Sequence, residues 1–154
     1  MLTAETRDFL ESGCALIIAT VSSTGEPFAS RGWGLDVLDD AGRVRLLLES
    51  GDRQALENLQ DTGRIAITAA HVPTLHALQL KGNYVGSHPG NERDRAKAAQ
   101  YADEFFADIE ATDGSPRALL ERLLPDDYVA CEIVIEELYD QTPGPGAGAS
   151  VPMP

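Results

Sequence analysis

Three short stretches of this 154-residue chain carry side chains that could bind an anion or a polar ring. In the first, Arg31 lies between Ala29 and Trp33 on a predicted strand. An arginine among apolar neighbours needs a carboxylate, a carbonyl or a ligand anion as its partner. At the edge of a sheet, the guanidinium could instead reach water. The position therefore indicates either a ligand contact or a solvated edge.

The second stretch, ESGDRQ, runs from a predicted strand into a short helix. The free N–H groups and the positive dipole end of a helix favour phosphate. Ser50 would add a hydroxyl, and Arg53 would add a fork of donors. Glu49 and Asp52 count against a bare anion site, and a capped helix with a surface arginine also fits these residues.

The third stretch is LQLKGN, in which Gln79 and Lys81 share one face of a predicted strand. Alternating polar residues normally face solvent in an antiparallel sheet. In a barrel that binds an aromatic cofactor, the same donors would line the rim of the site.

The remaining candidates for chemistry indicate neither a metal site nor a covalent mechanism. His71, His76 and His88 match no zinc-ligand spacing, and no Walker loop, zincin motif or EF-hand loop is present. Cys14 and Cys131 each lie within an apolar run, which favours buried thiols, while a disulfide between two strands stays open. No side chain is therefore named as a catalytic acid, base or nucleophile.

The net charge and the hydropathy of the chain argue against nucleic-acid-binding and membrane-spanning proteins. The formal net charge is −13, so the phosphate backbone of a nucleic acid would be repelled. No apolar run approaches the roughly 18 residues of a membrane span. The first ten residues lack the basic start and the apolar segment of a secretory signal. We expect a cytoplasmic protein that binds neither nucleic acid nor membrane.

The elements that position these stretches are mostly strands. Strand-length apolar runs lie at residues 14–21, 27–38, 43–48, 64–70, 77–85 and 128–138. The turn sequences STGE and DDAG join the first three strands into antiparallel hairpins. On the second strand, the period of two places five residues on one face: Ala29, Arg31, Trp33, Leu35 and Val37.

Helices are predicted at residues 4–12, 52–60 and 91–111. Another amphipathic helix is predicted after Ser115-Pro116, with an apolar stripe of Leu119, Leu120, Leu123 and Leu124. This order predicts a mainly β fold, a small antiparallel barrel with a helical insertion at residues 91–124 before the last strand.

One domain is expected at residues 1–141, followed by a Pro/Gly-rich tail at residues 142–154. The tail, TPGPGAGASVPMP, can form neither a helix nor the interior of a sheet. It should be flexible unless it lies against the body or a partner subunit.

The order of three stretches resembles the pyridoxamine 5′-phosphate oxidase-like FMN-binding split barrels. These stretches are CALIIATVSSTGEPFASRGWG, VRLLLESGDRQALENLQDTGRIAIT and LHALQLKGNYVG. The likeness covers about residues 5–85, residues 128–138 would supply the closing strand, and the ending LYDQTPGPGAG resembles the C-terminal segment of some flavin-binding members. The resemblance implies a six-stranded antiparallel split barrel and a homodimer that holds FMN between its subunits.

The resemblance also implies a set of cofactor-binding residues. With Lys81 from the same strand face as Gln79, the set is Arg31, Gly32, Trp33, Ser50, Arg53, Gln54, Gln79 and Lys81. The first three match the family's strand-two arginine and the backbone after it. The next three match the phosphate-binding start of the helix, and Gln79 matches a glutamine on a later strand that approaches the cofactor.

Two positions depart from the oxidase pattern. Gln54 stands where the oxidase has the lysine of an Arg-Lys pair, which removes one charge from the phosphate site. Asp36 stands where the oxidase has a lysine five residues after its strand-two arginine, which argues against pyridoxamine phosphate as the substrate. The helices at 91–124 also depart from the oxidase, and they would cover the site or shape its substrate range.

Three classes of function follow. The first is an FMN-dependent oxidoreductase that acts on a small molecule, with the flavin ring passing a hydride. The second is the same barrel with a deazaflavin or a haem, the haem requiring His71, His76 or His88 as its axial ligand. The third is a non-enzymatic binding or regulatory module, which the departures at Asp36 and Gln54 motivate. We expect the first, with its substrate and electron donor left open.

Overall fold

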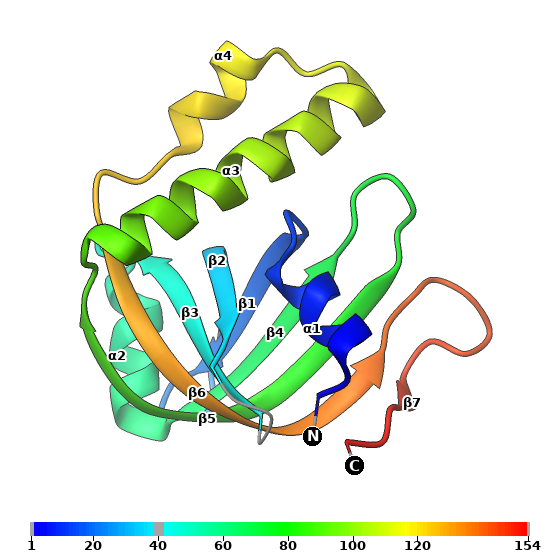
Figure 1. Ribbon diagram of the computed structural model, residues 1–154. Coiled ribbons are helices and arrows are strands. Elements are labelled where there is room, and N and C mark those ends of the chain that lie inside the picture. Colours follow the sequence, from blue (N-terminus) through cyan, green and yellow to red (C-terminus); the bar gives the residue numbers. More distant parts are fainter. Residues whose placement is uncertain (1, 39–41, 154) are drawn as a thin grey trace.

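The computed structural model describes residues 2–38 and 42–153, which form one barrel with attached helices (Figure 1). The elements, in chain order, are α1 (Ala4–Glu11), β1 (Ala15–Val21), β2 (Pro27–Val37), β3 (Arg43–Glu49), α2 (Arg53–Thr62), β4 (Arg64–Ala70), β5 (Ala77–Pro89), α3 (Glu92–Asp113), α4 (Arg117–Leu120), a 3₁₀ turn η1 (Glu121–Leu123), β6 (Tyr128–Asp140) and β7 (Ala149–Ser150).

Six antiparallel strands close into the barrel. Their order is β3-β2-β1-β4-β5-β6, and pairing of β3 with β6 completes the ring. The two 13-residue strands β5 and β6 pair with each other along most of their length. The predicted six-stranded antiparallel barrel is therefore confirmed, with β7 as an additional short strand paired to β6.

Alternation along each strand separates the core from the outer surface. On β1, Leu16, Ile18 and Thr20 are buried, whereas Ile17 and Ala19 between them are exposed. A core residue on one strand pairs with a core residue on the next, as Ile18 does with Ile67 of β4. Burial of these apolar faces inside the ring is the main stabilising contribution to the fold.

Helix α2 packs on β1, β2 and β4; it begins one residue after the start of the predicted range 52–60 and ends two residues beyond its end. The Asp52 carboxylate accepts from the backbone N–H of Ala55, and Gly63 ends the helix in the left-handed conformation at φ 69°. On its buried face, the Asn58 amide donates to the Thr20 hydroxyl at 3.0 Å. Both side chains are polar and buried, so this bond ties the helix to β1 without leaving an unsatisfied group there.

Strand β2 departs from the predicted alternation because it contains a bulge. Gly32 pairs with Leu48, but the next paired residue, Leu35, faces Leu46, so β2 carries one extra residue. Gly34, at φ 149°, lies in this bulge. The prediction that Ala29, Arg31, Trp33, Leu35 and Val37 share one face is therefore wrong. Leu35 points into the barrel and pairs with the buried Leu46 of β3, whereas Arg31 points outward.

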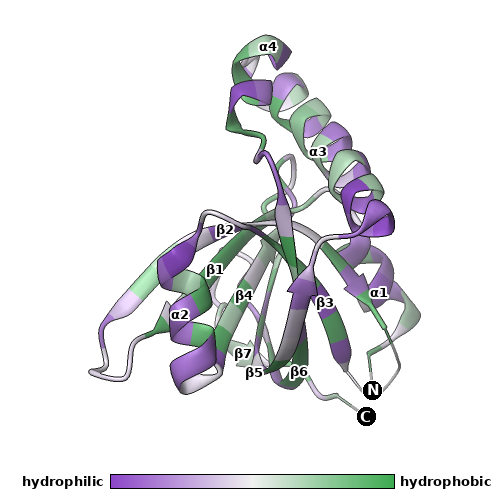
Figure 2. Cartoon of the chain, turned by 90° about the vertical axis from the view of Figure 1, so that its left-hand side faces the viewer, coloured by the Kyte–Doolittle hydropathy of each residue, from purple (hydrophilic) through white to green (hydrophobic). Residues whose placement is uncertain are grey.

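The insertion forms one long helix and one short one. Asn91 and Asp94 make a reciprocal capping box at the start of α3, which then crosses β2 on the outside of the barrel (Figures 1 and 2). Helix α3 approaches the segment between α1 and β1 closely at Gly13, where an added Cβ would lie 2.5 Å from the Cβ of Glu104.

The second amphipathic helix is shorter than predicted. Four residues form α4, and a 3₁₀ turn follows it. Only one leucine of the predicted stripe, Leu120, is buried, because only a single helical turn packs against α3. The other three leucines are exposed: Leu119, Leu123 and Leu124.

The tail lies against the barrel rather than extending from it. Ala149 and Ser150 pair with Asp140 and Tyr139 of β6, at the edge of the sheet and not in its interior. Both cysteines are buried free thiols, as the apolar runs predicted, and burial raises the pKa of Cys131 to about 12. In the described part of the chain, no helix is long and apolar enough to cross a membrane. The predicted DDAG turn covers residues 39–42, of which 39–41 lie outside the described residues.

Candidate functional site

The outward side of four neighbouring strands brings together predicted residues from distant parts of the sequence. Register places Arg31 of β2 beside Ile17 of β1, Ile17 beside Thr68 of β4, and Thr68 beside Gln79 of β5. The next row along the strands is Ala29, Ala19, Ala66 and Lys81. We call these eight residues the outward face. Because six strands close the ring, β2 and β5 lie three strands apart, so Arg31 and Gln79 mark the two ends of a curved row that runs halfway around the barrel.

Arg31 is held by aromatic rings and has no polar protein partner. Its guanidinium carbon lies 5.9 Å from the centroid of the Trp33 ring and 5.7 Å from that of Phe105 on α3. Among the described residues, no carboxylate or carbonyl accepts a hydrogen bond from it. The side chain is partly buried, and its five N–H donors stay available to a ligand or to water.

Gln79 and Lys81 stand at the other side of the outward face. The Gln79 amide nitrogen donates to the Thr68 hydroxyl at 3.1 Å, which fixes the amide and leaves its carbonyl oxygen without a protein donor in the described chain. The Lys81 ammonium lies 4.6 Å from the centroid of the Tyr139 ring on β6. A hydrogen bond to the Glu137 carboxylate holds the Tyr139 hydroxyl and raises the pKa of Tyr139.

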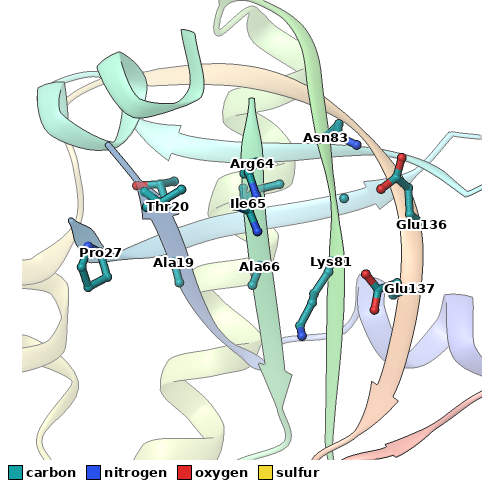
Figure 3. A pocket seen from close by; sticks show the side chains of 12 residues that line it. Ala19, Thr20, Pro27, Arg64, Ile65, Ala66, Lys81, Asn83, Glu136 and Glu137 are labelled. Carbon is teal, nitrogen blue, oxygen red and sulfur yellow. The ribbon is translucent and has the colours of Figure 1, made fainter. Parts of the chain in front are cut away.

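A groove of about 420 Å³ covers part of the outward face (Figure 3). Its floor is made of small residues, including Ala19 and Ala66, so the backbone of the sheet can be approached closely. Two cations, Arg64 and Lys81, and two carboxylates, Glu136 and Glu137, line the groove. Glu137 is the cross-strand partner of Lys81, so the formal charges of the groove balance and do not by themselves select an anionic ligand.

The start of α2 offers less to a phosphate than its sequence indicates. The Asp52 carboxylate occupies the position in front of the first turn, and the Ser50 backbone N–H donates to the carbonyl of Asp127 at 3.0 Å. Gln54 donates to Asn58 at 2.9 Å. Arg53 is exposed, and no described residue pairs with its guanidinium. Of this predicted group, Arg53 and the Ser50 hydroxyl remain available to a ligand.

Gly32 and Trp33 have structural roles next to Arg31. A Cβ on Gly32 would lie 3.0 Å from Leu16 and Leu46, so a side chain there would crowd the core. Trp33 is 4% exposed and packs edge to face on Phe106 of α3, with ring centroids 6.5 Å apart. Trp33 therefore belongs to the contact between barrel and insertion.

Asp36, the acidic residue that departs from the oxidase pattern, forms an ion pair with a lysine of the insertion. The Asp36 carboxylate lies 3.1 Å from the ammonium of Lys97 on α3, and both side chains are largely buried, at 18% and 14% exposure. Lys97 also donates to the carbonyl of Glu11 at 3.2 Å. The ammonium of Lys97 is thus already occupied by a protein carboxylate and a protein carbonyl.

The three histidines are each engaged by a protein group away from the groove. The Nδ1 atom of His71 lies 2.8 Å from the Thr74 hydroxyl, and that of His76 lies 2.9 Å from the Thr142 hydroxyl. His88 lies 3.8 Å from Asp94 at the start of α3. None of the described histidines lines the groove, and no group of three or more metal-ligating side chains occurs among the described residues.

Sequence reasoning missed three residues that contact the predicted ones. Thr68 fixes Gln79, and the pairing of β4 with β5 could have identified it, since each strand was predicted. Tyr139 is one residue beyond the predicted end of its strand. Phe105 lies within the predicted helix at residues 91–111, and no sequence signal indicates its contact with Arg31.

No known protein family matches the sequence when it is compared with family profiles, and no curated protein matches it significantly. Solved structures do match. The H111A variant of HupZ from Group A Streptococcus has a TM-score of 0.56 at 19% identity over 91% of this chain and 99% of its own. A candidate pyridoxamine 5′-phosphate oxidase from Lactobacillus delbrueckii has 0.55 at 19% identity over 90% and 93%.

An F420 reductase is also similar, with a TM-score of 0.54 at 13% identity over 89% of this chain and 98% of its own. At identities below 20%, these structural matches establish a shared fold and do not establish a shared function. The closed antiparallel barrel, the strand order and these matches agree with the resemblance seen in the sequence. The chain has the split-barrel fold of the pyridoxamine 5′-phosphate oxidase-like proteins.

Proposed function

We propose that this protein is an FMN-binding oxidoreductase that holds the cofactor against the outward face. The observation that carries the proposal is Arg31, a partly buried arginine for which no described residue provides a polar partner. Gln79 and Lys81 add donors on the outer surface of β5, halfway around the closed ring from β2. The position of Arg31 also matches the strand-two arginine of the flavin-binding split barrels. When bound, FMN would supply hydride transfer at its ring.

The residues present fit a flat, anionic cofactor. Small side chains at Ala19 and Ala66 leave room for a planar ring, and the groove of about 420 Å³ lies over them. Gln79 and Lys81 can hydrogen-bond to polar atoms at the edge of a ring. Arg31 and Arg53 can each pair with a phosphate, and Arg31 can alternatively stabilise negative charge on the reduced ring.

We further propose that the active form is a homodimer with the outward face at its interface. Ile17, near the middle of the first row of this face, is 46% exposed, and the next row of the face contains the small residues Ala19, Ala29 and Ala66. A second copy that covers this face would bury it and would enclose the groove.

The buried free thiols also support a cytoplasmic location, because disulfides are rare in that compartment.

Replacing Ile17 by Lys should dissociate this dimer. The new ammonium would lie beside its cross-strand partner Arg31, would be repelled by that guanidinium, and would lose its water on association. Light scattering after size-exclusion chromatography should give a monomer mass for Ile17→Lys and a dimer mass for the unchanged chain. Leu119→Lys is the matched control, since Leu119 is 54% exposed on α4, outside the outward face, and should leave the mass unchanged. A dimer for both variants would place the interface elsewhere.

A deazaflavin is the second candidate cofactor, because an F420 reductase shares the fold. Deazaflavin and flavin rings are similar in shape, and the outward face could accept either. The absorption spectrum of the purified protein, before and after FMN is added and the excess removed, tests the proposal. A retained flavin spectrum supports it. A Soret band would indicate haem and one of the histidines, and the absence of any retained chromophore would favour a deazaflavin or a non-enzymatic module.

A further inference from the structure

The contact between Arg31 and the insertion has a consequence for the cofactor site. Arg31 lies on β2, whereas Phe105, whose ring centroid is 5.7 Å from its guanidinium carbon, lies on α3. A guanidinium within about 6 Å of a ring face is attracted by the quadrupole of the ring, and more strongly where water is excluded. Phe105 is 4% exposed, so little water separates it from its neighbours.

Helix α3 is fixed firmly enough to hold Phe105 in place. Lys97 pairs with Asp36 of β2 at 3.1 Å, and Asp94 lies 3.6 Å from Arg45 of β3. Near Phe105 itself, the close approach of Gly13 leaves no space for the helix to move inward. Tyr101 stacks on the Phe105 ring, with centroids 5.6 Å apart. The ring therefore has a defined position relative to β2.

We propose that Phe105 is a positioning residue of the cofactor site and that the inserted helix is thereby a working part of it. The inference rests on the proposed function at Arg31. A long arginine side chain loses considerable rotamer freedom when it binds an anion. The aromatic contact restrains Arg31 before the ligand arrives, without using any of its N–H donors. The anionic cofactor then meets a guanidinium that is already held in place between Trp33 and α3.

The test compares Phe105→Leu with Phe106→Leu in the full-length protein. The two residues are adjacent on α3 and equally buried, at 4% and 1% exposure, but only Phe105 contacts Arg31. Each substitution removes one ring and keeps an apolar side chain, so both lower stability. We expect Phe105→Leu to raise the Kd for FMN about 3- to 20-fold, the range for a partly desolvated cation–π contact. Phe106→Leu should leave it within about twofold.

Measuring the effect of Phe105→Leu on the Kd for FMN in the Arg31→Ala variant shows whether Phe105 acts through Arg31. If Phe105 acts through Arg31, then Phe105→Leu should cause no further loss of affinity once Arg31 is replaced. An equal loss with and without Arg31, or an equal loss from Phe105→Leu and Phe106→Leu, would overturn the inference while leaving FMN binding intact. Conservative Phe105→Tyr retains the ring face and should restore most of the affinity.

A second readout separates the inference from the function on which it rests. In the unliganded protein, the Arg31 Nε–H proton resonance should be displaced by the ring current of Phe105, and Phe105→Leu should remove this displacement. If the unchanged protein binds no FMN, the proposed function and the positioning role both fall, and a displaced resonance then shows a purely structural contact. An undisplaced resonance overturns the inference even if FMN binds.

Discussion

Replacing Arg31 by Ala should weaken FMN binding about 10- to 150-fold, the equivalent of about 1.5–3 kcal/mol for a hydrogen bond to a charged group. The reason is that no described protein group uses the guanidinium donors, so their contribution is expected to appear only when a ligand is present. Isothermal titration of the apo protein with FMN measures the change directly.

Arg31→Lys provides the control for the chemistry of this contact. Lysine keeps the charge but loses the planar fork and the stacked contact with the rings, so we expect an affinity between those of Arg31→Ala and the unchanged chain. Arg53→Ala, at the start of α2, should also weaken binding, by about 1.5–3 kcal/mol if Arg53 pairs with the phosphate. An affinity for Arg31→Ala equal to that of the unchanged protein would remove Arg31 from the site.

Replacing Lys97 by Met should lower the free energy of unfolding by about 2–3 kcal/mol. Removing one partner of a buried ion pair commonly costs about 3–5 kcal/mol, and the 14% and 18% exposure of this pair reduces the expected loss through solvent screening. The Asp36 carboxylate would be left uncompensated between β2 and α3. Urea unfolding followed by the fluorescence of Trp33, which is buried under α3, measures the loss.

Arg95→Met is the matched control on the same helix. Arg95 lies 3.8 Å from Asp127, but both side chains are more than half exposed, so its removal should cost less than about 1 kcal/mol. The double variant Asp36→Leu with Lys97→Met should recover most of the lost stability, because no unpaired charge remains. Equal losses from Lys97→Met and Arg95→Met would show that the Asp36–Lys97 pair does not hold the insertion to the barrel.

Local patterns predicted most of the barrel because hairpins and alternation are local properties. The predicted strand at 64–70 coincides with β4, and the Asp52 cap and Gly63 end of α2 follow from residue types with known conformational preferences. The bulge in β2 did not follow, because it depends on the pairing with β3 rather than on the residues of β2 alone. As a result, Arg31 was grouped with Leu35, which faces the core.

The candidate site was predicted in part for the same reason. The alternation of LQLK correctly placed Gln79 and Lys81 on one face of β5, and register places Arg31 on the outer side of β2, three strands away. Contacts between distant elements were not predictable from spacing. Phe105 carries the helical periodicity of a core residue, and Lys97 that of a helix surface, yet one contacts Arg31 and the other neutralises Asp36.

Fluorescence titration of the full-length protein with FMN tests the central claim most directly. The single tryptophan, Trp33, neighbours Arg31, so a flavin bound on the outward face should accept its excitation energy. The account predicts strong quenching of Trp33 that saturates at one FMN per chain and shifts to higher FMN concentration in Arg31→Ala. Unchanged Trp33 fluorescence at saturating FMN, or the same titration curve in Arg31→Ala, would contradict it.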